Sequence, residues 1–68
     1  MKNLVLKGRI KTLGMNQADV AGKIGLSASR FNAKLNNTHG AEFSLREVRA
    51  LKNLLDLGAD EVDDIFFS

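Results

Sequence analysis

The sequence predicts an all-α fold of five short helices that form one compact domain of 68 residues. Apolar residues recur three and four positions apart along most of the chain, which is the spacing of one helix face. Three segments also share a helix-start pattern, in which a polar cap follows one apolar residue and precedes another by four positions. The three sets are Met15, Asn16 and Val20; Leu26, Ser27 and Phe31; and Phe43, Ser44 and Val48. In the last set, Glu47 is placed to complete a capping box with Ser44.

The first helix is predicted over residues 3–13, and Gly14 is expected to end it. Its inner side carries apolar residues at helical spacing, namely Leu6, Ile10 and Leu13, and its outer side carries Lys7 and Lys11. Gly8 lies inside this helix, where glycine costs about 1 kcal/mol relative to alanine. Close packing against a neighbouring helix is the explanation that the sequence offers for Gly8.

Residues 17–36 predict two short helices joined by a tight turn. Val20 and Ile24 form the apolar side of the first of them, and Ala21 is small enough to let the second approach closely. Gly25 suits the left-handed conformation that closes a helix. The second helix is expected over about residues 28–36, with Ser27 as its N-cap.

This second helix has two unlike faces. Phe31 and Leu35 fall on one side as a core stripe. The opposite side carries small or hydrogen-bonding side chains, namely Ser29, Asn32, Ala33 and Asn36, with Arg30 and Lys34 beside them. Short polar side chains let a helix approach base edges, and flanking cations neutralise phosphates. The same face is also compatible with an ordinary solvated helix surface.

Residues 37–42 predict a polar connecting loop. His39 in this loop has two interpretations, a phosphate contact or a solvated side chain. With one histidine and no cysteine in the chain, we expect no metal site and no other cofactor.

Two further helices are predicted after the loop. The fourth spans residues 45–57, ends at Gly58, and turns inward the apolar residues Val48, Leu51, Leu54 and Leu55. The fifth spans residues 59–66, and Asp60 and Glu61 suit the positive end of its dipole. Its inner stripe consists of Val62, Ile65 and Phe66.

Phe67 lies outside that stripe, because two adjacent phenylalanines cannot both face inward on one short helix. Two interpretations remain open. In one, a second subunit covers apolar area formed by Val62, Phe66 and Phe67. In the other, Phe67 folds back over the first helix.

Charge divides the chain into two unlike halves. Residues 1–37 contain seven Lys or Arg against one Asp, a formal charge of +6, whereas residues 38–68 contain three against seven acids, a charge of −4. Such a polarity would orient the domain on a polyanion, although chance segregation in a short chain is the alternative. Without an apolar run of membrane-spanning length, and with a charged N-terminal segment, we expect a soluble cytoplasmic protein without a membrane partner.

The chain resembles the Cro/CI-type helix-turn-helix regulators of phages. The resemblance depends on Gln17, Ala21 and Gly25 at four-residue intervals, and on apolar residues at the buried positions of that family, namely Val20, Ile24, Leu26 and Phe31. The segments KLNN and EFSL, the leucine-rich helix and the terminal IFF are similar to short single-domain phage regulators of Gram-positive bacteria. Lys34 departs from the pattern, because many members bury an apolar residue at this position. Leu35 is expected to take the packing role of that residue.

The resemblance implies a five-helix, lambda-repressor-like domain that binds double-stranded DNA as a dimer, with residues 28–36 in the major groove. It implies base contacts from Ala28, Ser29, Asn32 and Ala33. It implies phosphate contacts from Gln17, Arg30, Lys34, Asn36 and Asn37. No small-molecule substrate is expected.

Two other classes of binding protein remain open for this sequence. A helix-turn-helix scaffold could bind a partner repressor or a polymerase subunit through residues 62–67 and bind DNA only weakly. An antitoxin-type regulator is a third possibility, although no disordered toxin-binding tail is evident. An enzyme has little support, because His39 lacks an evident nucleophile partner and no phosphate-binding glycine loop is present.

Overall fold

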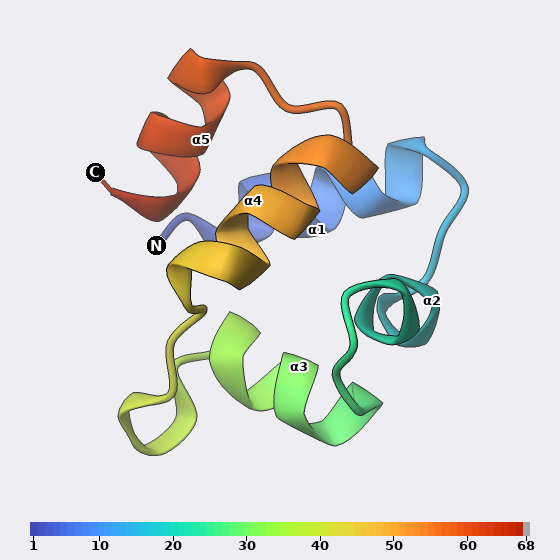
Figure 1. Cartoon of the computed structure of the whole chain (residues 1–68), viewed down its shortest axis with the longest axis vertical. Helices are drawn as coiled ribbons and strands as arrows, with labels where there is room; N and C mark the ends of the chain where they lie inside the picture. The colour runs from blue at the N-terminus through green and yellow to red at the C-terminus, as the bar shows by residue number, and fades with distance from the viewer. Residues whose placement is uncertain (68) are drawn as a thin grey trace.

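Helices make up most of residues 1–67, the part of the chain that the computed structural model describes (Figure 1). The five α-helices are α1 (Asn3–Thr12), α2 (Gln17–Lys23), α3 (Ala28–Leu35), α4 (Leu45–Leu54) and α5 (Ala59–Phe66). A short 3-10 turn, η1 (Thr38–Gly40), separates α3 from α4, and no strand occurs within residues 1–67. The predicted all-α fold of five helices is therefore confirmed.

The predicted helix starts are confirmed by their side-chain caps. The Asn16 side chain accepts a hydrogen bond from the Asp19 amide at 2.8 Å, and the Ser27 hydroxyl accepts one from the Arg30 amide at 3.1 Å. Ser44 caps α4 in the same way, and the Glu47 carboxylate accepts a hydrogen bond from the Ser44 amide at 2.8 Å. These caps satisfy amides that the first turn of a helix leaves without partners.

Glycine ends the first two helices, as predicted. Gly14 and Gly25 have φ angles of 73° and 80°, in the left-handed region that glycine adopts without a steric penalty. After Gly25, the Leu26 amide donates to the Ala21 carbonyl at 2.9 Å, the long hydrogen bond of a Schellman motif. This motif makes the turn between α2 and α3 tight.

The end of α4 differs from the prediction. The helix stops at Leu54 rather than at residue 57, and Asp56, with a φ angle of 52°, adopts a left-handed conformation before Gly58 is reached. The Leu57 amide donates to the Lys52 carbonyl at 2.9 Å, and Leu57 enters the core, 4% exposed. Gly58 has a φ angle of −74° and serves as the N-cap of α5. Burial of Leu57 explains why the helix ends before the glycine.

All five helices contribute to one apolar core. Its buried residues are Leu6, Ile10, Val20, Ala21, Phe31, Leu35, Leu51, Leu55, Leu57 and Ile65. Phe43 lies between Phe31 and Phe66, with ring centroids 5.5 and 6.0 Å away. This chain of rings links α3 and α5 through the segment that precedes α4.

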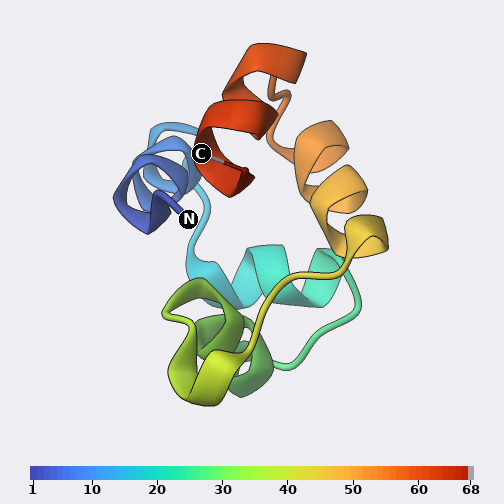
Figure 2. The ribbon, with the colours of Figure 1, turned by 90° about the vertical axis from the view of Figure 1, so that its left-hand side faces the viewer.

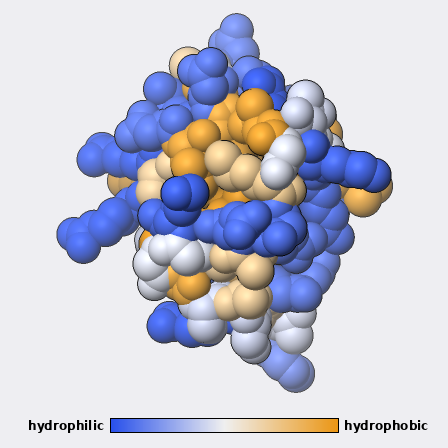
Figure 3. Space-filling model, turned by 90° about the vertical axis from the view of Figure 1, so that its right-hand side faces the viewer, coloured by the Kyte–Doolittle hydropathy of each residue, from blue (hydrophilic) through white to orange (hydrophobic). Residues whose placement is uncertain are grey.

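Two predictions for α1 are wrong. Leu13, expected on the inner side, is 42% exposed, because α1 ends at Thr12 and Leu13 is its C-cap. Gly8 is exposed, and a side chain added there would meet nothing within 4 Å, so close packing within the chain does not explain it. Leu4, on the outer side, is 78% exposed. On the side of the molecule where α1 ends, apolar atoms gather at the middle of a hydrophilic surface (Figure 3).

The helices are arranged so that α3 and η1 lie at one end of the molecule and α5 at the other (Figure 1 and Figure 2). The Lys2 amide donates to the Ile65 carbonyl at 2.8 Å, which joins the N-terminal segment to α5. Within residues 1–67, no helix combines the length and apolar composition that crossing a bilayer requires.

We predict that Leu51→Ala lowers the free energy of unfolding by about 2–5 kcal/mol, because it removes a fully buried side chain from the core. Leu45→Ala is the matched control on the same helix, since Leu45 is 64% exposed, and it is expected to change stability by about 0.5 kcal/mol or less. Urea unfolding followed by circular dichroism measures both. Equal losses in the two variants would contradict the described core.

Candidate nucleic-acid interface

The polar row of α3 faces solvent. Phe31 and Leu35 are fully buried, and the helical period then turns the opposite side of α3 outward. Its exposed members are Ala28, Ser29, Asn32 and Asn36, while Ala33 is half-buried. No other part of residues 1–67 buries these four side chains, so the row is free for an external contact.

Two amides in this row contact each other. The Asn36 side-chain nitrogen donates to the Asn32 side-chain oxygen and, at 3.1 Å, to the Asn32 carbonyl. This pairing uses one acceptor site of the Asn32 oxygen and leaves its two N–H donors without a partner in the described residues. Asn36 is the C-cap of α3 rather than its last helical residue, one position from the prediction. The pair holds Asn32 in one orientation on the exposed face.

Lys34 has a partner within the chain. Its ammonium donates to both carboxylate oxygens of Glu47, at 2.7 and 2.8 Å, and each of the two side chains is only 15% exposed. The prediction placed Lys34 beside the row as a phosphate contact. The structure instead directs its charge toward the start of α4.

Asn37 ties down the turn that follows α3. It adopts a left-handed conformation with a φ angle of 51°, which asparagine tolerates better than most residues. Its side-chain nitrogen donates to the Ala41 carbonyl at 3.0 Å and so closes η1.

His39 in the same turn is exposed, and no three His, Cys, Asp or Glu side chains of residues 1–67 gather closely enough to hold a metal ion.

Gln17, the first residue of α2, borders a shallow hollow between α1 and α2. Lys7 and Lys11 of α1 line the same hollow, and neither forms an ion pair within residues 1–67. Sequence reasoning placed these lysines only on the outer side of the first helix and missed their approach to Gln17. Their four-residue spacing was the available signal, because it puts both on one helix face.

Some of the cations in residues 1–37 form ion pairs within the fold. Three cations of the basic half pair with acids of the other half: Lys2 with Asp64, Arg9 with Glu61, and Lys34 with Glu47. In the described residues, four cations of the basic half form no ion pair, namely Lys7, Lys11, Lys23 and Arg30. Arg30 is exposed on α3 beside the polar row.

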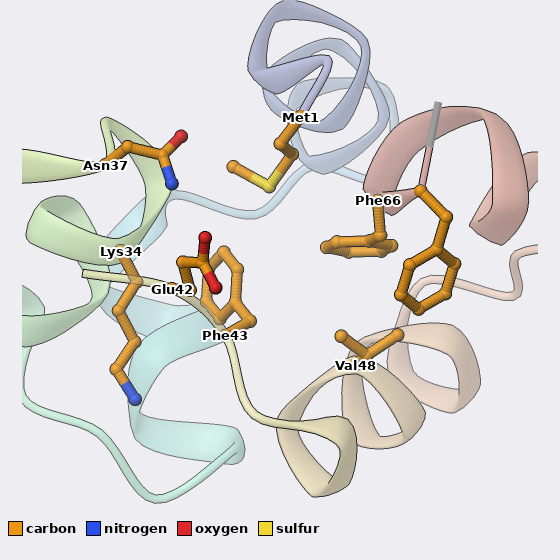
Figure 4. A pocket seen from close by; sticks show the side chains of 8 residues that line it. Met1, Lys34, Asn37, Glu42, Phe43, Val48 and Phe66 are labelled. Atoms are coloured by element: carbon orange, nitrogen blue, oxygen red, sulfur yellow. The ribbon is translucent and has the colours of Figure 1, made fainter. Parts of the chain in front are cut away.

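The three residues of the candidate dimer surface differ in exposure. Val62 and Phe66 are half-buried against the core, whereas Phe67 is 63% exposed. The interpretation in which Phe67 folds back over α1 is therefore wrong. Phe67 instead contacts the Phe66 ring, 6.5 Å between centroids. Both rings line a hollow of about 210 Å³ that Met1, Phe43 and Val48 also border, with Lys34, Asn37 and Glu42 at its polar side (Figure 4).

Comparison with known proteins adds no relative. No family model matches the chain, and searches of curated proteins and of solved structures find no match. The functional assignment therefore depends on the residues and their geometry.

The ion pair of Glu47 predicts a dependence of stability on pH. Burial disfavours its charged form, but the Lys34 ammonium and the Ser44 amide outweigh that effect and hold the pKa of Glu47 below its ordinary value of 4.5. A carboxylate with a lowered pKa in the folded state stabilises fully above the unfolded-state pKa. This contribution is lost as the pH falls below 4.5 and through the lower folded-state pKa.

As the pH falls from about 5 to about 3, we therefore expect the free energy of unfolding to decrease less in Glu47→Gln than in the protein with Glu47. Urea unfolding at a series of pH values measures this slope. Glu42→Gln is the control, because the Glu42 side chain is exposed and has no ion pair in the described residues. An unchanged slope in Glu47→Gln would show that the carboxylate has no stabilising partner in solution.

Proposed function

We propose that this chain is a sequence-specific regulator that binds double-stranded DNA, with a helix-turn-helix formed by α2 and α3 in a lambda-repressor-like domain. The exposed polar row of α3, opposite buried Phe31 and Leu35, is the observation that carries the proposal. The outer side of a helix fits the width of the major groove of B-form DNA. In this proposal, α3 enters the groove and α2 crosses the backbone.

Base reading is assigned to residues 28–33 of α3. Ser29 can donate and accept, and Asn32 carries two N–H donors beside the oxygen that Asn36 contacts. Ala28 and Ala33 are suited to thymine methyl groups. Each good polar base contact is worth about 1–3 kcal/mol of discrimination, so two such residues give limited direct readout. DNA shape then supplies part of the specificity.

Phosphate contacts are assigned to the exposed groups around the row. Arg30 is unpaired and exposed, and Gln17 lies beside the unpaired Lys7 and Lys11. Asn36 and Asn37 follow at the other end of α3. These groups supply affinity without sequence preference, because phosphates are the same at every base pair.

The biological setting follows from the resemblance to Cro/CI-type regulators. In this proposal the protein is a phage or prophage regulator that acts in the bacterial cytoplasm as a dimer on a two-fold operator. Exposed Phe67, the C-cap of α5, is the residue assigned to the surface between the two copies.

A protein-interaction module is the second candidate function. The observation that favours it is Phe67, 63% exposed beside the hollow formed with Met1 and Phe66. On this alternative, a partner protein fills the hollow and DNA binding is weak and indifferent to sequence. Selection of bound fragments from a pool of random duplexes separates the two candidates, because a two-fold consensus is expected only for the DNA-binding regulator.

Substitutions on α3 are expected to separate base contacts from phosphate contacts. Asn32→Ala should change the consensus obtained by selection, because it removes donors that face the base edges. Arg30→Gln should keep the consensus and reduce the salt dependence, d log K/d log[salt], by about one unit. Electrophoretic mobility shifts at several salt concentrations measure both. If Asn32→Ala selected the same consensus with the same affinity, α3 would not be the reading helix.

Phe67→Ser tests the dimer. Burying a phenylalanine contributes about 1.5–3 kcal/mol, so its loss should weaken binding to a duplex with two half-sites by about tenfold or more. Affinity for a duplex with one half-site should stay the same. Leu45→Ser is the matched control, because Leu45 and Phe67 are 64% and 63% exposed. Equal weakening by both substitutions, or by neither, would remove Phe67 from the dimer surface.

A further inference from the structure

The ion pair between Lys34 and Glu47 joins the proposed reading helix to the body of the domain. Both side chains are 15% exposed, whereas the pair of Lys2 with Asp64 is 51% and 54% exposed. The carboxylate of Glu47 also accepts from the Ser44 amide, so one group holds Lys34 of α3 and the first turn of α4 together. A sheltered pair with two hydrogen bonds is geometrically more demanding than a solvated one.

Apolar packing determines which side of α3 faces the core, and polar contacts can set its rotation more finely. Phe31 and Leu35 provide apolar burial, which is favourable but not directional. A second polar contact comes from α1, where the Asn3 side chain donates to the Leu35 carbonyl at 3.3 Å. Both polar contacts lie in the C-terminal half of α3, and one comes from α1 and the other from α4.

We propose that Lys34 and Glu47 are positioning residues, which fix the angle at which α3 presents Ser29 and Asn32 to the base edges. This inference rests on the proposed DNA-binding function. Lys34 then contributes to specificity through α3 and makes no phosphate contact. A small rotation of α3 about its axis would move the short side chains of Ser29 and Asn32 out of hydrogen-bond range, because neither can reach further.

The test uses two variants that change the pair and little else. Lys34→Met keeps most of the aliphatic stem and removes the ammonium. Glu47→Gln removes the charge but keeps the capping box, because glutamine serves at this position as glutamate does. Lys52→Gln is the control, since Lys52 is an exposed cation of α4 without an ion pair in the described residues. Circular dichroism and urea unfolding establish that each variant is folded at the assay temperature.

The measured quantity is the ratio of affinities for the selected duplex and for a random duplex, together with the salt dependence. Lys34→Met and Glu47→Gln should each lower the ratio by about tenfold, as the loss of one aligned base contact would. The salt dependence of Lys34→Met should stay the same. The double variant should lose no more than either single variant, because both remove one interaction. Lys52→Gln should leave the ratio unchanged.

A phosphate contact from Lys34 predicts the opposite pattern. Lys34→Met would then keep the ratio and reduce the salt dependence by about one unit, and Glu47→Gln would raise affinity for every duplex by releasing the ammonium. Either result overturns the positioning role and leaves the proposed function intact. If the parent protein selects no sequence from random duplexes, the proposed function fails, and the positioning role fails with it.

Discussion

Burial of Phe31 and Leu35 is the constraint on which the rest of the structure depends. Both side chains are fully buried, and they draw the Phe43 ring and, through it, the Phe66 ring into one aromatic chain. Since successive side chains of a helix turn by a fixed angle, this burial also determines what α3 shows to solvent. The core and the proposed reading face are therefore two consequences of the same helical pattern.

Electrostatics serves the fold as well as the proposed interface. Three of the cations in the basic half form ion pairs with acids of the other half, which bring α1 to α5 and α3 to α4. The cations that remain unpaired lie on α1, α2 and α3, the helices that the proposal places against DNA. The formal charge of +6 of residues 1–37 therefore overstates the charge that is free to meet a polyanion.

Local rules predicted the helix starts and the first two helix ends, because caps and glycines act within a few residues. They did not predict that α4 ends before the left-handed Asp56, because burial of Leu57 is a tertiary effect. They also did not predict that Leu13 is exposed, because α1 ends at Thr12. The exposed row of the candidate site followed from helical periodicity. The partner of Lys34 could not be predicted, because Glu47 lies 13 residues away on another helix and helical periodicity does not reach across helices.

The central claim is that the exposed side of α3 meets DNA. Nuclear magnetic resonance titration of the labelled protein with a selected duplex tests it most directly, residue by residue. We expect the largest shifts on the amides of residues 28–36 and on the side-chain amides of Gln17 and Asn32, with α5 little changed in a single half-site complex. Shifts confined to α5 and the N-terminal residues, with α3 unchanged, would contradict it.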